Sequence, residues 1–316
     1  MTSARTREGV VVAGSLHVDL IASAHRLPVR GESLIGQTFA IEPGGKAGNQ
    51  AASVAAQDVR CAMVGRVGDD EFGGMLLDSL RRHGVDAALV VVDSSAATGA
   101  STVLTGEGGD YASIVVPAAS ALIDAGQIAG ARDSLERAAV AVTQLELGGM
   151  IAEAFLAAAR DAGCRTVLNA APVPDDLSAV PASLWNVVDV VVANRVEAAM
   201  LLGLDAAAAA SATPDAAALA RRLGVRGAVV TLGGDGLGAC LDGAATRVSA
   251  WPVEVVDTVG AGDAFVGVLA ASLASGIAWH GALVRANAAG ALAVARRGGA
   301  LPPGKAEIDT FLAERG

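Results

Sequence analysis

The chain has 316 residues, a formal net charge of −10, 53% hydrophobic residues and only 3% aromatic residues. This length fits one large α/β domain or two smaller ones, and the scarcity of aromatic residues requires a core of small, closely packed aliphatic side chains. The acidic balance argues against a nucleic-acid-binding protein, because such proteins usually carry a basic face.

Apolar, β-branched runs alternate along the chain with helical patterns, which predicts a mostly parallel sheet with helices on both faces. The expected strands are Val10–Ala13, Cys61–Val64, Ala139–Gln144, Thr166–Asn169, Val188–Ala193 and Ala228–Leu232. The expected helices are Gly48–Ala56, Phe72–His83, Ile151–Ala162, Arg195–Leu202 and Ala216–Leu223. No interdomain linker and no internal repeat interrupt this order, so we expect residues 1–316 to form a single domain.

Two segments break the alternation, Leu20–Ile41 and Thr98–Val116, and both have the pattern of short β segments joined by turns. A third segment, Ala264–Val284, contains no charged residue and is long enough to raise the question of a membrane span. Its break at Ser275-Gly276 favours a helix buried in an α/β core instead.

The N-terminal residues before Val10 are polar and lack the apolar core of a signal peptide, so we expect a cytoplasmic protein. The three cysteines, Cys61, Cys164 and Cys240, lie far apart and have neither C-x-x-C nor Cys/His spacing. They indicate neither a disulfide framework nor a zinc site.

The most informative segment is Val256–Phe265, with the sequence V-D-T-V-G-A-G-D-A-F. Gly260 and Gly262 allow the backbone to turn with its N–H groups outward, and a helix that begins there offers a phosphate site. Asp263 would lie in the first turn, where a carboxylate repels phosphate but can take a proton from a hydroxyl that attacks phosphorus. The segment therefore predicts a phosphoryl-transfer site with its own base. The alternative is an ordinary glycine-rich turn with a helix-start aspartate.

The sequence D-T-V-G-A-G-D-A-F resembles the C-terminal signature of the ribokinase-like (PfkB) family of carbohydrate kinases. The sequence of Gly44–Ala51, G-G-K-A-G-N-Q-A, resembles the family's N-terminal signature G-G-K-G-x-N-x-A. Further landmarks follow in the family's order: Gly14–Asp19, Gln144–Glu146, Asn169–Pro172, Asn194–Glu197 and Thr231–Gly233. The resemblance covers nearly the whole chain, from about Val10 to Leu312, and Pro28–Ala51 carries a finer resemblance to the ribokinase branch.

This resemblance implies a three-layer α/β/α fold with a mostly parallel central sheet, in which segments at approximately 20–41 and 98–116 form a small β-sheet lid. It implies an ATP-dependent kinase that transfers the γ-phosphate to a sugar hydroxyl, with O5 of D-ribose as the expected acceptor. Mg²⁺ is expected with ATP and K⁺ beside the anion pocket. The expected assembly is a homodimer formed through the lid, without nucleic-acid or membrane partners.

The resemblance also implies roles for individual residues. Asp263 is the expected catalytic base, and the backbone N–H groups of Gly260, Ala261 and Gly262 are the expected anion hole. Besides Asp263, the residues expected to contact the sugar are His17, Asp19, Gly44, Gly45, Lys46, Asn49 and Glu146. For Lys46 and Glu146 the alternative is a solvated surface position.

The residues expected to contact the nucleotide are Asn194, Thr231, Gly233, Gly236 and Asn287. Glu197 is expected to act on Mg²⁺ through water, because Mg²⁺ keeps much of its hydration shell. The alternative is that Asn194 only caps a helix on which Glu197 is exposed. The expected K⁺ ligands are Asp257, Val259, Arg297 and Gly299, partly through backbone carbonyls.

His17 departs from the family pattern, because the ribokinase branch has asparagine there and imidazole differs in bulk and in hydrogen-bonding groups. With histidine at this position the substrate can be D-ribose or another acceptor, such as 2-deoxyribose, a fructose derivative or a nucleoside. Pro302 stands where a serine is expected near the end of the K⁺ loop. A non-catalytic sugar-binding homologue is a further alternative, against which the intact G-A-G-D argues. A Rossmann-type enzyme is disfavoured because no G-x-G-x-x-G follows the first strand.

Overall fold

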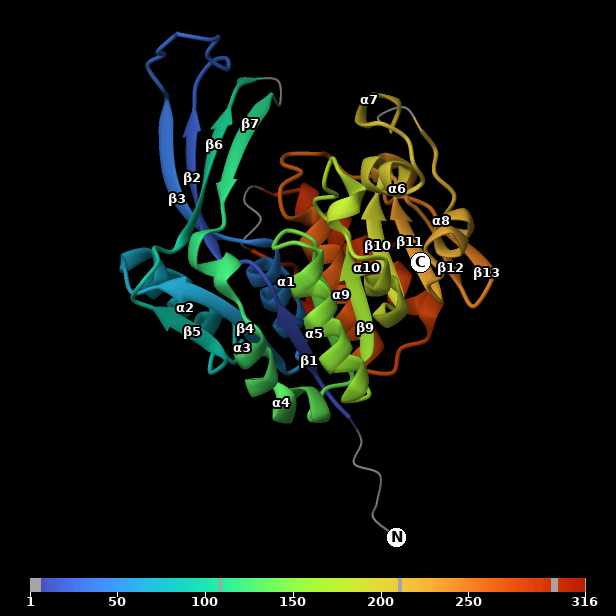
Figure 1. Cartoon of the computed structure of the whole chain (residues 1–316). Coiled ribbons are helices and arrows are strands. Elements are labelled where there is room, and N and C mark those ends of the chain that lie inside the picture. The colour runs from blue at the N-terminus through green and yellow to red at the C-terminus, as the bar shows by residue number, and fades with distance from the viewer. Residues whose placement is uncertain (1–6, 108–109, 210–211, 297–300, 316) are drawn as a thin grey trace.

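The computed structural model describes residues 7–107, 110–209, 212–296 and 301–315, which form a layered body and a smaller separate sheet (Figure 1). Within these residues the central sheet has nine strands in the order β13-β12-β11-β10-β9-β8-β1-β4-β5. They are β1 (Val10–Ala13), β4 (Cys61–Gly68), β5 (Val90–Asp93), β8 (Val140–Gln144), β9 (Arg165–Asn169), β10 (Val190–Asn194), β11 (Gly227–Thr231), β12 (Leu237–Leu241) and β13 (Ala244–Val248). All pair in parallel except β12 and β13 at one edge, so the predicted mostly parallel sheet is confirmed.

Helices cover both faces of this sheet, as predicted. One face carries α3 (Ala125–Gly130), α4 (Arg132–Arg137), α5 (Gly149–Asp161), α6 (Arg195–Leu201) and α8 (Ala216–Leu223). The other carries α1 (Lys46–Ala55), α2 (Glu71–Arg82), α9 (Ala261–Ala274) and α10 (Trp279–Val294). Two further helices are α7 (Ala206–Ala209), beside α6, and α11 (Lys305–Ala313), packed against α10.

The residues of the inner strands β1, β8, β9, β10 and β11 are mostly buried on both sides of the sheet, which explains why these strands have continuous apolar sequences. In β1, Val11 belongs to the core beneath α5, whereas Val10 and Val12 belong to the core beneath α1 and α9. Successive side chains of a strand point to opposite faces, so each strand contributes to two cores. Small aliphatic side chains dominate both cores, in agreement with the composition.

The smaller sheet has the order β3-β2-β6-β7 and projects from one end of the body (Figure 1). Its strands are β2 (His17–Ser23), β3 (Thr38–Gly44), β6 (Gly99–Thr105) and β7 (Tyr111–Val116). The predicted lid segments are confirmed as β structure, but the boundary at residue 20 was wrong. The sheet begins at His17 and extends to Gly44, because these two residues pair directly in the ladder. We call this sheet the lid.

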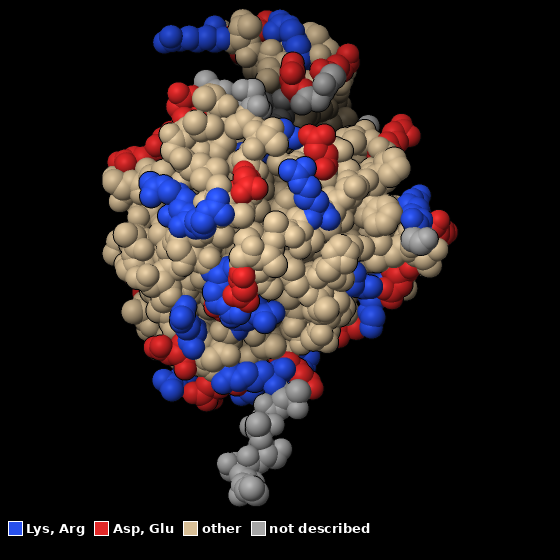
Figure 2. Space-filling model, turned by 90° about the vertical axis from the view of Figure 1, so that its right-hand side faces the viewer, with Lys and Arg blue, Asp and Glu red and all other residues tan. Residues whose placement is uncertain are grey.

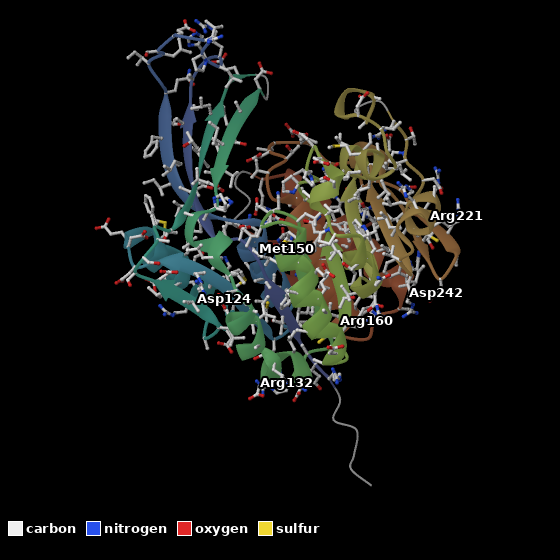
Figure 3. The ribbon with its side chains drawn as sticks, in the orientation of Figure 1. Asp124, Arg132, Met150, Arg160, Arg221 and Asp242 are labelled. Atoms are coloured by element: carbon white, nitrogen blue, oxygen red, sulfur yellow. The ribbon has the colours of Figure 1, made fainter. Side chains whose placement is uncertain are left out.

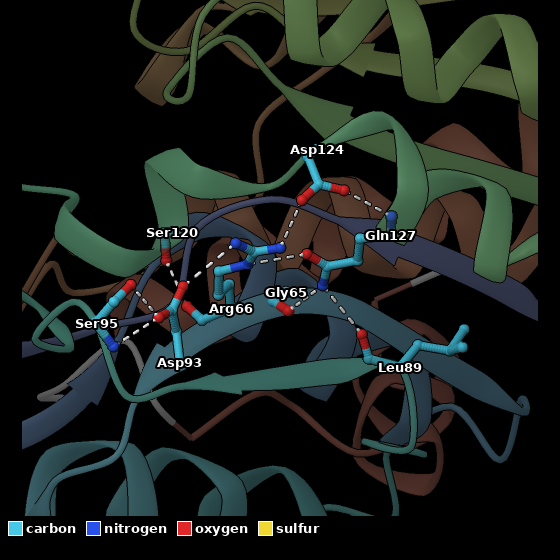
Figure 4. Close-up of polar contacts among 8 residues, drawn as sticks. All are labelled: Gly65, Arg66, Leu89, Asp93, Ser95, Ser120, Asp124 and Gln127. Atoms are coloured by element: carbon cyan, nitrogen blue, oxygen red, sulfur yellow. Dashed lines mark hydrogen bonds and ion pairs between the residues drawn. The ribbon is translucent and has the colours of Figure 1, made fainter.

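Polar side chains at one edge of the central sheet join β4 and β5 to the start of α3 (Figure 4). The Arg66 guanidinium lies 3.3 Å from the Asp93 carboxylate and 3.0 Å from that of Asp124. The Ser120 hydroxyl accepts from the Leu16 N–H at 3.1 Å and lies 2.9 Å from the Leu16 carbonyl, just before β2. The contacts between Ser120 and Leu16 fix the point from which the first lid strand departs.

The apolar segment 264–284 is divided between α9 and α10, and Gly276 between them has φ +74°. This confirms the predicted break and the buried helix, since almost every residue of α9 after Gly262 is buried. Among the described residues, no helix is both long and apolar enough to cross a membrane.

The sequence prediction missed β5, β12 and β13. A turn at Asp242-Gly243 joins β12 to β13, and both residues have positive φ, +48° and +83°. An Asp-Gly pair with positive φ is typical of a tight β-hairpin. The pair was therefore a usable signal, but the flanking runs are short and contain mostly small residues.

Charged side chains are distributed over the outside of the molecule. Figure 2 shows acidic and basic side chains intermixed on one face, with broad neutral areas between them. In Figure 3, Arg132 and Arg160 lie toward the lower end of the body, whereas Met150 lies at the start of α5. That helix follows β8, so Met150 marks the edge at which the parallel strands end.

The close contact between α1 and α9 generates a prediction. A Cβ on Gly267 of α9 would lie 2.6 Å from the Gln50 carbonyl oxygen of α1. Gly267→Ala should therefore lower the free energy of unfolding by about 1–3 kcal/mol through overpacking. Gly74→Ala in α2 is the matched control, because a Cβ there meets no atom within 4 Å. It should raise stability by up to about 1 kcal/mol. Urea denaturation measures both, and equal effects of the two substitutions would contradict this account.

Candidate active site

The first turn of α9 lies at the carboxyl edge of the sheet. Gly260 precedes the helix with φ +77°, and its carbonyl accepts from the Ala264 N–H at 2.8 Å. Asp263 is the third helical residue, as predicted, and a Cβ on Gly262 would meet no atom within 4 Å. The first N–H groups of a helix have no partner within the helix. The Ala261 N–H has a long bond of 3.4 Å to the Thr258 carbonyl, and the turn borders open space at Gly262, with a carboxylate beside it.

The Asp263 side chain is only 9% exposed. Its Oδ1 accepts from Gln50 Nε2 at 2.9 Å, and its Oδ2 accepts from Asn49 Nδ2 at 3.3 Å. Burial raises the pKa of Asp263, and the charge of Glu146 adds to this, while Lys46 and the two amide donors partly oppose it. A buried carboxylate with a raised pKa at the start of a helix is suited to accept a proton.

The lid supplies the neighbouring part of the site. Ser101 Oγ donates to Asp19 Oδ1, and His17 Nδ1 lies 3.1 Å from the same oxygen. A Cβ on Gly44 would lie 2.6 Å from the Asp19 carboxyl carbon, so only glycine fits opposite this carboxylate. Gly45 has φ +93°, and a Cβ there would lie 2.5 Å from the Ser15 carbonyl oxygen. The two glycines thus let the end of β3 approach β2 and the loop between β1 and β2 closely.

Glu146 links the lid side of the site to Asp263. Its carboxylate accepts from Ser15 Oγ, and its charge acts on both His17 and Asp263. His17 is 6% exposed, and its burial disfavours the imidazolium. The carboxylates of Asp19 and Glu146 outweigh burial, so the pKa of His17 is raised.

Lys46 begins α1 and connects the two halves of the site electrostatically. Its charge acts on His17, on Asp263 and on Glu197. Glu197 and Asn194 form a capping box at the start of α6, in which each side chain bonds to the other's backbone N–H, at 2.8 Å and 2.9 Å. Burial, with a smaller effect of Asp263, raises the pKa of Glu197. The residue is therefore a half-buried helix cap whose charge also interacts with Lys46 and Asp263.

The residues expected at the nucleotide lie along the next part of the same edge. Thr231 pairs with Asn194 in the ladder between β10 and β11. Gly233 and Gly236 form the turn after β11, with φ +60° and +82°. Asn287 in α10 donates from Nδ2 to the Ser249 carbonyl at 2.8 Å.

The residues expected at metal ions are only partly described. Asp257 Oδ1 accepts from the Val259 N–H at 3.0 Å, so these two lie together in one turn before α9. Arg297 and Gly299 lie outside the described residues. Within the described part of the chain, no group of three His, Cys, Asp or Glu side chains could hold a metal ion. The oxygen donors of Asp257 and Glu197 suit hard cations that take further ligands from phosphate, water or backbone.

The structure thus brings His17, Asp19, Gly44, Gly45, Lys46, Asn49, Glu146 and Asp263 into one site. Several polar partners were not predicted: Ser15, Gln50, Ser101, Gln144 and Asn169. Gln50, Gln144 and Asn169 stand inside the quoted motifs, which was the available signal. Their roles depend on contacts between residues far apart in sequence.

Comparison with known proteins gives a consistent result. The sequence model of the pfkB family carbohydrate kinases matches residues 7–305. Ribokinase of Mus musculus is 31% identical over 270 residues, covering 84% of this chain and 81% of the relative. Ribokinase of Schizosaccharomyces pombe is 31% identical over 312 residues, covering 95% and 96%. The structure of Arabidopsis thaliana ribokinase complexed with ribose and ATP is 26% identical, with a TM-score of 0.83, and covers 97% of this chain and 99% of that chain.

The charge balance around His17 generates a prediction. Asp19→Asn should lower the pKa of His17. The substitution removes the negative charge that stabilises the imidazolium, whereas the burial that disfavours the imidazolium remains. A raised folded pKa contributes stability that is present below the unfolded pKa and is lost as pH rises through the folded pKa. Side-chain NMR of the four histidines measures the shift. Asp78→Asn, exposed on α2, is the control. A pKa of His17 that stays the same or rises in Asp19→Asn would rule out the pairing.

Proposed function

The chain belongs to the pfkB family of carbohydrate kinases, and we propose that its reaction is transfer of the γ-phosphate of ATP to O5 of D-ribose. The family makes it a phosphotransferase with a sugar alcohol group as acceptor. The similarity to two ribokinases, over 84% and 95% of this chain, supports ribose as the sugar. The observation that carries the mechanism is the buried Asp263 carboxylate beside the first turn of α9.

In this mechanism Asp263 accepts the proton of the sugar hydroxyl as its oxygen attacks the γ-phosphorus. The N–H groups of Gly260, Ala261 and Gly262 form the anion hole for the charge on the transferring phosphoryl group. Preorganised donors of this kind contribute about 3 kcal/mol each to transition-state stabilisation. The open space at Gly262 supports the approach of phosphate to this turn.

The sugar lies between the lid and α1. Asp19 accepts from sugar hydroxyls through the carboxylate that Ser101 holds in place. Gly44 and Gly45 allow the backbone to contact the sugar, and Asn49 supplies an amide next to Asp263. Lys46 and Glu146 complete the polar walls, which their electrostatic effects on Asp263 support.

The nucleotide lies along the edge formed by the ends of β10 and β11, on the other side of Asp263. It contacts Asn194, Thr231, Gly233, Gly236 and Asn287. The alignment of these residues along one sheet edge supports this position.

Two cations are part of the proposal. Glu197 would hold Mg²⁺ through water, and the ion would supply charge neutralisation on the phosphates. Asp257 and the Val259 carbonyl would hold K⁺ in the turn before α9, with Arg297 and Gly299 as the proposed remaining ligands. The shared turn of Asp257 and Val259 supports this cation position.

We propose a single-domain, cytoplasmic protein that forms a homodimer through the lid. The lid leaves large apolar side chains in solvent, among them Phe39 at 66% and Ile114 at 72% exposure. Several exposed large apolar side chains on one small sheet support an interface there.

His17 favours a second candidate, a family member that phosphorylates another sugar or a nucleoside. The buried imidazole sits 3.1 Å from Asp19, inside the proposed sugar site, where the ribokinase branch has a smaller amide. An altered donor pattern there changes which hydroxyl arrangement is bound. A non-catalytic role is disfavoured by the intact Asp263.

The experiment is ADP release from Mg·ATP with K⁺ present, against D-ribose, 2-deoxyribose, fructose, other pentoses and adenosine. Turnover should be strongest with D-ribose, and Asp263→Asn should reduce kcat by roughly 10²–10⁴-fold. Activity should fall as pH drops through the raised pKa of Asp263, because a protonated carboxyl cannot accept the proton.

Strongest turnover with another acceptor would replace ribose by that acceptor and make His17 the specificity residue. Wild-type activity in Asp263→Asn would overturn the proposed base.

A further inference from the structure

A chain of buried amide side chains leads from the central sheet to Asp263. Gln144 Nε2, at the end of β8, donates to Gln50 Oε1 at 2.7 Å. Gln50 Nε2 donates to Asp263 Oδ1 at 2.9 Å and to Asn169 Oδ1 at 3.0 Å. Gln50 has no exposed surface, and Gln144 is 2% exposed. Burying amides this completely is costly unless they are hydrogen-bonded, and both groups of the Gln50 amide are bonded here, whereas Gln144 bonds through its Nε2 and its buried Oε1 has no partner.

The donor and the acceptor of each hydrogen bond in this row of amides follow from their partners. Asn169 Nδ2 donates to the Val192 carbonyl at 3.3 Å, and a carbonyl can only accept, so Asn169 Oδ1 must face Gln50. An ionised Asp263 also only accepts. Gln50 Nε2 is therefore held between two acceptors, and its Oε1 must turn to the donor on Gln144.

The two oxygens of Asp263 consequently differ. Oδ1 accepts the short bond from the fully buried Gln50, whereas Oδ2 has the longer bond, 3.3 Å, from the partly exposed Asn49. Protonation of Oδ1 would make it a weaker acceptor for the N–H of Gln50, which the second hydrogen bond to Asn169 holds in place. Protonation of Oδ2 weakens only the longer bond from Asn49, so Oδ2 is the oxygen that takes up a proton at the lower cost.

We propose that Gln50 is a positioning residue that keeps Asp263 Oδ1 as a permanent acceptor and thereby makes Oδ2 the proton-accepting oxygen. This inference rests on the proposed function of Asp263 as the base. In the reaction the sugar O–H bond breaks and its proton passes to Oδ2. The new O–P bond forms as the bond between the γ-phosphorus and the β-γ bridging oxygen breaks, and ADP leaves with that electron pair. Gln50 exchanges no proton.

The test uses Gln50→Met, which removes the amide at similar side-chain length. Its first readout is the pKa of Asp263 by carboxyl ¹³C NMR, assigned by the signal missing in Asp263→Asn. The pKa should rise, because a donor to the carboxylate is lost while the charges of Lys46, Glu146 and Glu197 remain. The second readout is the pH profile of kcat/KM, whose acid limb should shift to higher pH by the same amount. The value of kcat should fall roughly 10²-fold through misplacement of the base.

Thr143→Val is the matched control. Thr143 is 2% exposed, precedes Gln144, and donates to the Ala13 carbonyl at 2.9 Å without contacting Asp263. It should leave the pKa of Asp263 and the acid limb unchanged. Gln144→Met is a second variant, which removes only the donor to Gln50 and should shift both readouts in the same direction by less.

If Gln50→Met does not fold, Gln144→Met decides the question by the same readouts. An unchanged pKa of Asp263 in a folded Gln50→Met overturns the inference, even if Asp263→Asn is inactive and the proposed base stands. Full activity of Asp263→Asn instead overturns the proposed base, while the NMR shift still reports whether Gln50 fixes the carboxylate.

Discussion

The site depends on keeping one carboxylate, that of Asp263, ionised at the buried start of an apolar helix. Removing a charge from water is costly unless other groups replace its hydration. Here the replacements come from α1, which supplies two amide donors and the charge of a lysine. The cost of burying the charge exceeds what these groups recover, so the pKa of Asp263 is raised. Such a pKa suits a residue that must take up a proton during the reaction.

The fold brings these compensating groups together. Parallel strands end at the same edge of the sheet, so loops that are distant in sequence meet there. β8 delivers Gln144 and Glu146, β9 delivers Asn169, and the helices α1 and α9 cross above them. The close approach of α1 and α9 depends on Gly267, which brings the Gln50 backbone against α9. The lid adds the Asp19 carboxylate and the His17 imidazole, both from β2.

Sequence reasoning predicted most of the fold because the strands are buried on both faces and the helices begin at recognisable residues. The bounds of α8 at Ala216–Leu223 and the placement of Asp263 in the first turn of α9 are examples. It failed at the hairpin of β12 and β13, whose short runs resemble loops. It also could not join Gln50 to Gln144, Asn169 and Asp263, which are 94, 119 and 213 positions away. Which polar residues of a motif meet is set by packing, which one sequence does not contain.

The most direct measurement is a crystal structure with D-ribose, a non-hydrolysable ATP analogue and Mg²⁺. The account predicts that Asp263 Oδ2 lies at roughly 2.6–3.2 Å from the acceptor hydroxyl. It also predicts that Gln50 Nε2 remains on Oδ1 and that the γ-phosphate lies at the N–H groups of Gly260 to Gly262. A hydroxyl bound out of reach of Asp263, or a carboxylate rotated so that Oδ1 faces the sugar, would contradict it.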